Sequence, residues 1–111
     1  MTIKWYVEAV ADIGKIYDYY VTKNPRAAAM LYNRILDDVE ILKRQPYIAA
    51  VEQMLLDCPE GYRSLVVGNY KVIYFIKDDL VLIVQVFDCR QNPIKLKRIA
   101  LRRRSPSEMV V

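Results

Sequence analysis

The sequence predicts an α+β protein in which an N-terminal helical hairpin packs on a small antiparallel β-sheet, with the elements in the order β-α-α-β-β-β. Two observations predict this class. Apolar residues recur every three or four positions across residues 8–44, the spacing of amphipathic helices. Runs rich in β-branched and aromatic residues then follow between residues 62 and 87, separated by short turn signals. At 111 residues the chain suffices for one core, so we expect one domain over residues 1–98 and a basic, loosely ordered tail over residues 99–111.

The N-terminal segment begins with a short strand and continues as a helix. Ile3 and Trp5 alternate with polar residues, a pattern typical of a strand that pairs with a sheet edge. From residue 8 to residue 21 the apolar side chains form one stripe at helical spacing. Gly14 lies within this stretch and lowers the stability of the helix by about 1 kcal/mol relative to alanine.

A second helix is predicted over residues 26–44. Asn24 followed by Pro25 is a helix-start signal, because asparagine caps free backbone amides and proline at the first helical position lacks only an N–H that has no partner there. Pro46 prevents the helix from continuing. Because the connection between the two helices is short, we expect them to form an antiparallel hairpin.

A connecting segment and three strands complete the predicted domain. Residues 45–61 contain Pro46, Pro59 and Gly61 around an irregular apolar patch, which indicates a connection with about one helical turn. The N-terminal strand should pair with one edge of the meander that follows, and the helical hairpin should cover one face and leave the other open. The three strands of the meander are expected over residues 62–67, 70–77 and 80–87, joined by turns at Gly68-Asn69 and Asp78-Asp79.

The register of the meander decides which cations meet. Two-residue turns would set Lys71 opposite Val86. Arg90 follows Val86 by an even number of residues, so its side chain would point to the same face, and Lys71 and Arg90 would converge there. Arg63 would lie on the opposite face unless a bulge at Gly68 shifts it. Each of these cations also has a structural alternative, Lys71 at the sheet rim beside Asp88 and Arg63 paired with Glu60.

The charge is concentrated in the second half of the chain. Residues 60–111 carry ten basic and five acidic side chains, against seven basic and eight acidic in residues 1–59, for a net charge of +4. Such an asymmetry favours an anionic partner such as nucleic acid or an acidic protein. Interleaved apolar residues indicate that the first part of the basic run packs on the domain. The basic run, which we expect to bind nucleic acid or an acidic partner or else to be solvated, consists of Lys95, Lys97, Arg98, Arg102, Arg103 and Arg104.

Several classes of protein are disfavoured by what the sequence lacks. No apolar stretch reaches the roughly 20 residues that span a bilayer, and the first residues do not resemble a signal peptide, so we expect a cytoplasmic protein without membrane contact. Cys58 and Cys89 are too few for a disulfide framework. The chain has no histidine, and we expect no metal ion and no cofactor.

The meander carries a recognisable set of motifs. They are Arg63-x-Leu65 in one strand, Gly68-x-Tyr70-Lys71-Val72-x-Tyr74 in the next, and Arg90 before Pro93 at the end of the third. Together with Ala9, Asp12, Ile16, Tyr19, Tyr20 and Pro25 in the helical part, this layout resembles the RelE/ParE toxin superfamily over roughly residues 3–93. The resemblance implies the toxin, also known as a plasmid stabilisation protein, of a type II toxin–antitoxin pair, neutralised by an antitoxin that covers the meander or the helical hairpin.

The superfamily divides by target, and the sequence bears on both branches. RelE-like members cleave mRNA on the ribosome, whereas ParE-like members inhibit DNA gyrase and are not enzymes. Arg63, Lys71 and Arg90 fall where the cleaving branch places catalytic cations, with lysine in place of the usual arginine. No tyrosine or histidine follows Arg90, although many cleaving members use one there. We therefore expect a ParE-like gyrase inhibitor, with a ribosome-dependent endonuclease and a degenerate, non-toxic binding module as alternatives.

Overall fold

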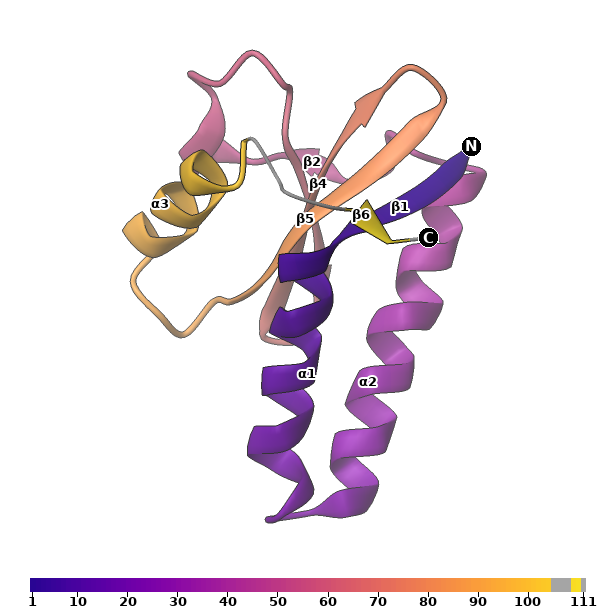
Figure 1. The fold of residues 1–111 in the computed structure, drawn as a ribbon, viewed down its shortest axis with the longest axis vertical. Helices are drawn as coiled ribbons and strands as arrows, with labels where there is room; N and C mark the ends of the chain where they lie inside the picture. Colours follow the sequence, from indigo (N-terminus) through magenta and orange to yellow (C-terminus); the bar gives the residue numbers. More distant parts are fainter. Residues whose placement is uncertain (105–108, 111) are drawn as a thin grey trace.

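The protein is an α+β domain in which a helical hairpin lies against one side of a twisted sheet (Figure 1). The computed structural model describes residues 1–104 and 109–110. No helix within these residues is long and apolar enough to cross a membrane. In chain order the elements are β1 (Thr2–Tyr6), α1 (Val7–Val21), α2 (Pro25–Glu40), the 3-10 helix η1 (Ile41–Lys43), β2 (Ala50–Val51), the 3-10 helix η2 (Gln53–Leu55), β3 (Arg63–Val67), β4 (Tyr70–Lys77), β5 (Leu80–Asp88), α3 (Ile94–Arg102) and β6 (Met109–Val110).

The sheet has the strand order β2-β3-β4-β5-β1-β6. Strands β3, β4 and β5 form the expected antiparallel meander, and β1 joins its β5 edge as expected. The sheet is mixed, however, because β1 runs parallel to β5, with Thr2 beside Leu80 and Trp5 beside Ile83. The two-residue strand β2, which the sequence left within the connecting segment, extends the other edge by pairing with β3.

The helical hairpin forms as predicted, and its second helix begins at the asparagine–proline pair. The Asn24 side chain accepts a hydrogen bond from the Ala27 amide at 3.0 Å, and Pro25 is the first helical residue. Ile13 from α1 and Ile35 and Val39 from α2 are buried in the core beneath the sheet. Burial of this apolar stripe, rather than intrinsic helix propensity, supplies most of the stability of such a hairpin.

The face of the sheet away from the hairpin is covered, contrary to the expectation that it would be open. Helix α3 packs there against β5 and η2, and its Leu96 is buried. The side chain of Gln85 on β5 is 1% exposed, and its amide nitrogen donates to the carbonyl of Leu96 at 3.0 Å. The interleaved apolar residues of the basic run thus dock as expected, although Ile94 and Leu101 remain exposed.

Helix α3 extends past the boundary that the sequence analysis placed between domain and tail. The boundary drawn at residue 98 falls within α3, which continues to Arg102, and Arg103 contacts the domain directly. β6 pairs antiparallel with the start of the chain, Val110 lying beside Trp5. Residues 105–108 and 111 of the expected tail lie outside the described residues.

A β-bulge changes the predicted register between β4 and β5. Tyr74 pairs with Ile83, but its neighbour Ile73 pairs with Gln85, so Val84 has no partner residue on β4. Lys71 consequently lies opposite Phe87, and the predicted pairing with Val86 is wrong. One extra residue in a strand moves every side chain beyond it to the opposite face of the sheet. The side chains of β5 after Val84 therefore lie on the opposite faces from those that the regular register predicts.

Candidate functional site

Arg90 is held by a carboxylate just beyond the end of β5. Its Nε donates to Asp88 Oδ1 and its Nη2 to Asp88 Oδ2, both at 2.9 Å, and its backbone amide donates to Oδ1 at the same distance. Hydrogen bonds from Arg90 to the carboxyl of Asp88 lower the pKa of Asp88. This two-point pairing fixes the plane of the guanidinium group.

Two phenols complete the cluster around Arg90. The hydroxyl groups of Tyr20, at the end of α1, and Tyr70, at the start of β4, each lie 3.1 Å from Arg90 Nη2, and the Tyr70 hydroxyl donates to that of Tyr20 at 3.4 Å. The hydrogen bonds from Tyr70 and Arg90 lower the pKa of Tyr20. Burial, together with the bond it donates, raises the pKa of Tyr70. Tyr20 is therefore the phenol of this pair that ionises more readily.

A second ion pair lies further back along β5. The two terminal nitrogens of the Arg103 guanidinium group, Nη1 and Nη2, donate to Asp12 on α1 at 2.7 and 3.0 Å, and Nη1 also donates to the carbonyl of Val84 at 2.9 Å. The amide of Val86 donates to Asp12 at 3.0 Å. Because β1 stops pairing with β5 at Ile83, these two side chains take the place of the missing strand.

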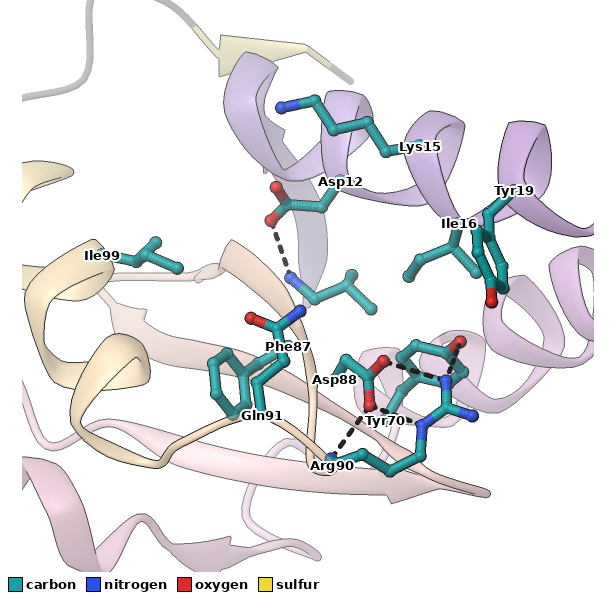
Figure 2. A pocket seen from close by; sticks show the side chains of 11 residues that line it. Asp12, Lys15, Ile16, Tyr19, Tyr70, Phe87, Asp88, Arg90, Gln91 and Ile99 are labelled. Carbon is teal, nitrogen blue, oxygen red and sulfur yellow. Dashed lines mark hydrogen bonds and ion pairs between the residues drawn. The ribbon is translucent and has the colours of Figure 1, made fainter.

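Asp12 and the pair of Asp88 and Arg90 line one groove over the edge of β5. α1 and α3 form its walls, and its volume is about 490 Å³. Figure 2 shows Asp12 near one end and the cluster of Asp88, Arg90 and Tyr70 near the other. Ile16 and Ile99 also line the groove, together with Val86 and Phe87 from β5.

Arg63 lies on the side of the sheet that faces the helical hairpin, opposite to Lys71 as predicted but on the same face as Arg90, contrary to the prediction. It pairs with Tyr74 across β3 and β4, and its guanidinium group donates to the carbonyl of Ala49 at 2.7 Å and lies over the ring of Tyr47. It does not pair with Glu60, whose carboxyl binds Arg104 instead. The structure thus ties Arg63 to the segment before β2.

Lys71 is paired with a buried carboxylate. Its Nζ lies 2.7 Å from Oε1 of Glu52, a side chain that is 1% exposed, and Glu52 Oε2 accepts from the Met54 amide at 2.8 Å. Burial of Glu52 favours its neutral form, but the bonds from Lys71 and Met54 outweigh that effect and hold the pKa of Glu52 below its ordinary value. Lys71 therefore stabilises the start of η2. The structural alternative considered from the sequence, with Lys71 at the sheet rim beside Asp88, is wrong.

The three cations of the predicted cleaving site do not converge. Tyr70 and Lys71 are adjacent on β4 and so point to opposite faces, and Arg90 contacts Tyr70. The expected convergence of Lys71 and Arg90 is wrong because the bulge at Val84 reverses the facing of β5 before Arg90. Arg63 shares the face of Arg90, but it pairs with Tyr74, whereas Arg90 contacts Tyr70. These two tyrosines are four residues apart on β4, which corresponds to roughly 13 Å along the strand.

The basic run after Arg90 divides into two groups. In the first group each cation has an acidic partner: Lys97 binds Asp57 at 3.0 Å, Arg103 binds Asp12, and Arg104 binds Glu60 through two bonds of 2.7 and 2.8 Å. These contacts fix α3 and the residues after it to the domain. In the second group, Lys95, Arg98 and Arg102, each side chain is exposed and has no acidic partner within the described residues.

Sequence reasoning missed several residues of the groove and of the cluster around Arg90. Asp12 and Tyr20 entered only as part of the family resemblance, and Tyr70 and Asp88 were not considered as site residues. The sequence did contain an indication that Asp12 is a site residue. Asp12 lies on the apolar stripe of its helix, three residues after buried Ala9 and four before Ile16. A carboxylate in that stripe must find a buried partner.

Comparison with known proteins places this geometry in context. The family model described as "ParE toxin of type II toxin-antitoxin system, parDE" matches residues 3–93. A solved structure titled "Chromosomal ParDE TA system from P. aeruginosa" is similar with a TM-score of 0.67 and 24% sequence identity, over 79% of this chain and 95% of that chain. No curated protein matches the chain.

Proposed function

This chain belongs to the ParE toxin family of type II toxin–antitoxin systems, and from that premise we propose that it inhibits DNA gyrase and is neutralised by a cognate antitoxin. The observation that carries the choice of target is the separation of the three cations that a cleaving site would use. Lys71 and Arg90 lie on opposite faces, each paired with a carboxylate. Arg63 is bound to backbone carbonyls.

Cleavage of RNA by its own 2′-hydroxyl group needs three things in one place. A base removes the hydroxyl proton, cations stabilise the charge on the phosphate, and an acid protonates the leaving oxygen. The positive field of Arg90 is partly offset by Asp88, which binds it at two points, and Lys71 neutralises a buried acid. The arrangement thus supports a toxin that acts by binding, in the cytoplasm where its target lies.

A ribosome-dependent endonuclease remains the second candidate because of one contact. The Tyr20 hydroxyl, whose pKa is lowered, lies 3.1 Å from the guanidinium group of Arg90, and Arg90 lines an open groove. A phenol of lowered pKa beside a cation is the pair that proton abstraction near a phosphate requires. If the chain cleaves mRNA, Tyr20 and Arg90 are the residues that we expect to do so.

Purified protein tests the proposal in two parallel assays. In the first, relaxed plasmid, ATP and gyrase are incubated with increasing amounts of the chain; in the second, translating ribosomes are incubated with it and the mRNA ends are mapped by primer extension. We expect loss of supercoiling and intact mRNA. Cut mRNA with normal supercoiling would establish the endonuclease instead, and no effect in either assay, with no arrest of growth on expression, would establish a non-toxic binding module.

Variants separate the two mechanisms further. Lys71→Ala combined with Arg90→Ala would abolish a nuclease that uses these cations, whereas a gyrase inhibitor that binds through its helices or α3 keeps its activity. Because Lys71 also stabilises the fold, Lys71→Arg with Arg90→Lys serves as the charge-conserving control. We expect both double variants to inhibit supercoiling at concentrations within about threefold of the unaltered chain, provided that circular dichroism shows them folded.

A further inference from the structure

Helix α3 lies at one side of the molecule and carries a row of cations on its outward face (Figure 1). Leu96 and Ala100 are buried against the domain, so the opposite side of the helix faces solvent. At about 100° per residue, Lys95, Arg98 and Arg102 fall within about 60° of one another on that solvent-facing side. All three side chains are exposed, and we call them the outer stripe.

The outer stripe keeps its positive charge because the acidic side chains near α3 are bound elsewhere. Lys97, Arg103 and Arg104 each bind an acidic side chain of the domain. Within the described part of the chain, no carboxylate forms an ion pair with the outer stripe. Lys95 donates a hydrogen bond of 3.4 Å to Gln91, whose side chain is neutral. Three positive charges therefore remain on one side of a short helix.

This row of like charges opposes the formation of its own helix. Arg98 lies three residues after Lys95 and four residues before Arg102, the spacings at which side chains are neighbours on a helix surface. Like charges at these spacings destabilise a helix. An anionic ligand that lies along the stripe would remove this repulsion, so the outward face of α3 is suited to bind one.

The geometry of the stripe suits the backbone of a nucleic-acid duplex. The three cations are spread over about 10 Å of the helix axis, and a strand of a DNA duplex carries one negative charge about every 3.4 Å of its axis, so that each cation can meet a phosphate. Residues 91–104 contain no aromatic side chain. Because single-stranded nucleic acid is bound largely by stacking of its bases on aromatic side chains, the stripe favours a duplex.

An acidic protein fits the same face less well. The centre of a protein–protein interface is depleted in charged residues. On α3 the centre of the outward face is Arg98, and the exposed apolar residues Ile94 and Leu101 lie to one side of it. The groove beside α1 is a separate surface, because among the described residues α3 lines that groove with Ile99 and not with the outer stripe.

We propose that the outer stripe binds the phosphate backbone of duplex DNA, with each cation contacting one phosphate. Such binding is independent of base sequence, because contacts to phosphate carry no sequence information. The inference goes beyond the proposed function, since this binding requires neither gyrase nor an antitoxin. A toxin held on duplex DNA would be concentrated on the substrate of its proposed target.

The salt dependence of DNA binding tests the site. A fluorescein-labelled duplex of about 20 base pairs is titrated with the full chain at several salt concentrations, and binding is followed by fluorescence anisotropy. Three phosphate contacts predict that log Kd rises with log salt concentration with a slope of about 2.7. We expect a Kd of about 1 to 100 μM at about 50 mM salt. The corresponding single strand should bind at least about threefold more weakly.

Removal of the three charges locates the binding. Lys95→Gln, Arg98→Gln and Arg102→Gln together should weaken duplex binding about tenfold or more at low salt and lower the slope by about 2.7. Thermal unfolding should show this triple variant to be at least as stable as the unaltered chain, because the repulsion within the stripe is gone. A loss of binding is then not a loss of fold.

The matched control removes the same charge from other elements. Arg26→Gln in α2, Arg44→Gln after η1 and Lys77→Gln in β4 alter exposed cations that form no ion pair within residues 1–104 and 109–110. We expect this control to bind the duplex within about twofold of the unaltered chain and to keep its salt dependence.

Three results would overturn the proposal. They are failure of the duplex to bind at low salt, equal weakening by the stripe and control variants, and displacement of the duplex by poly-glutamate at a lower charge concentration than by unlabelled duplex, which would assign the stripe to an acidic protein. The proposed function fails separately, because the anisotropy assay contains no gyrase. A chain that binds duplex DNA through the stripe but leaves supercoiling unaffected would retain this site and lose the gyrase target.

Discussion

Asp12 and Arg103, which are 91 residues apart in the sequence, form a two-point ion pair that also hydrogen-bonds the backbone of β5 at its bulge residue, Val84, and two residues further on, at Val86. Both side chains are 16% exposed. The pair joins the first helix to the segment after the last one, and it satisfies the amide of Val86 and the carbonyl of Val84, which no strand reaches. Loss of either partner thus leaves a charge and a backbone group without partners in a poorly hydrated site.

The first prediction concerns this pair. Arg103→Ala should lower the free energy of unfolding by about 2 kcal/mol, because it leaves the Asp12 carboxylate and the Val84 carbonyl unpaired. Urea unfolding of the two single variants and the double variant with Asp12→Ala would give the coupling energy, which we expect to exceed about 1 kcal/mol. Arg102→Ala, at the exposed neighbouring position, should change stability by less than about 0.5 kcal/mol.

The second prediction concerns Lys71 and Glu52. Lys71→Met should lower the free energy of unfolding by about 2 kcal/mol, since the buried Glu52 carboxylate then lacks its cation, whereas Lys71→Arg should be nearly neutral. Urea unfolding of both variants measures the difference. If Lys71→Met is as stable as the unaltered chain, the ion pair makes no net contribution and Lys71 is available for another role.

The third prediction follows from the lowered pKa of Glu52. A carboxyl whose pKa is lower in the folded than in the unfolded state stabilises the fold fully above its ordinary pKa of 4.5, and that stabilisation is lost as the pH falls toward the folded value. Urea midpoints measured from pH 6 downward should therefore decline less steeply for Glu52→Gln than for the unaltered chain. Parallel declines in the two proteins would mean that Glu52 titrates normally.

The fourth prediction concerns the phenol of Tyr20. Tyr70→Phe removes the hydrogen bond that contributes most to its lowered pKa, and Arg90→Ala removes the next, so both substitutions should raise the pKa of Tyr20. NMR titration of chain labelled with 13C at the tyrosine Cζ positions resolves this residue. Tyr47→Phe, beside Arg63, should leave the titration of Tyr20 unchanged.

The fifth prediction concerns two glycines. Gly14→Ala should stabilise the fold by about 1 kcal/mol, because Gly14 lies within α1 and a Cβ there would meet no atom within 4 Å. Gly68→Ala should instead destabilise it by about 1 kcal/mol, because Gly68 has a φ of +58° in the turn between β3 and β4. Thermal unfolding of the two variants checks both signs, and a Gly14→Ala variant that unfolds earlier would contradict the first.

Local patterns in the sequence predicted the elements that local physics determines. The helix start at Asn24-Pro25, the two turns of the meander and the strand boundaries follow from residues next to one another in the chain. The bulge at Val84 does not, because it lies where β1 ends and where Asp12 and Arg103 bind the backbone of β5, and these contacts join residues far apart in the sequence. For the same reason the sequence assigned Lys71 and Arg90 to one site, although a single unpaired residue separates them onto two faces.

The parallel pairing of β1 with β5 sets the order in which the chain can fold. Thr2 through Trp5 find their partners only at Leu80 through Ile83, and Asp12 finds its partner only at Arg103. During synthesis β1 therefore has no strand to pair with until β5 has left the ribosome, although α1 can already pack against α2, which follows it in the chain. A partner that recognises the edge of β5 with Arg103 bound to the carbonyl of Val84 can therefore bind only after residue 103 has been synthesised.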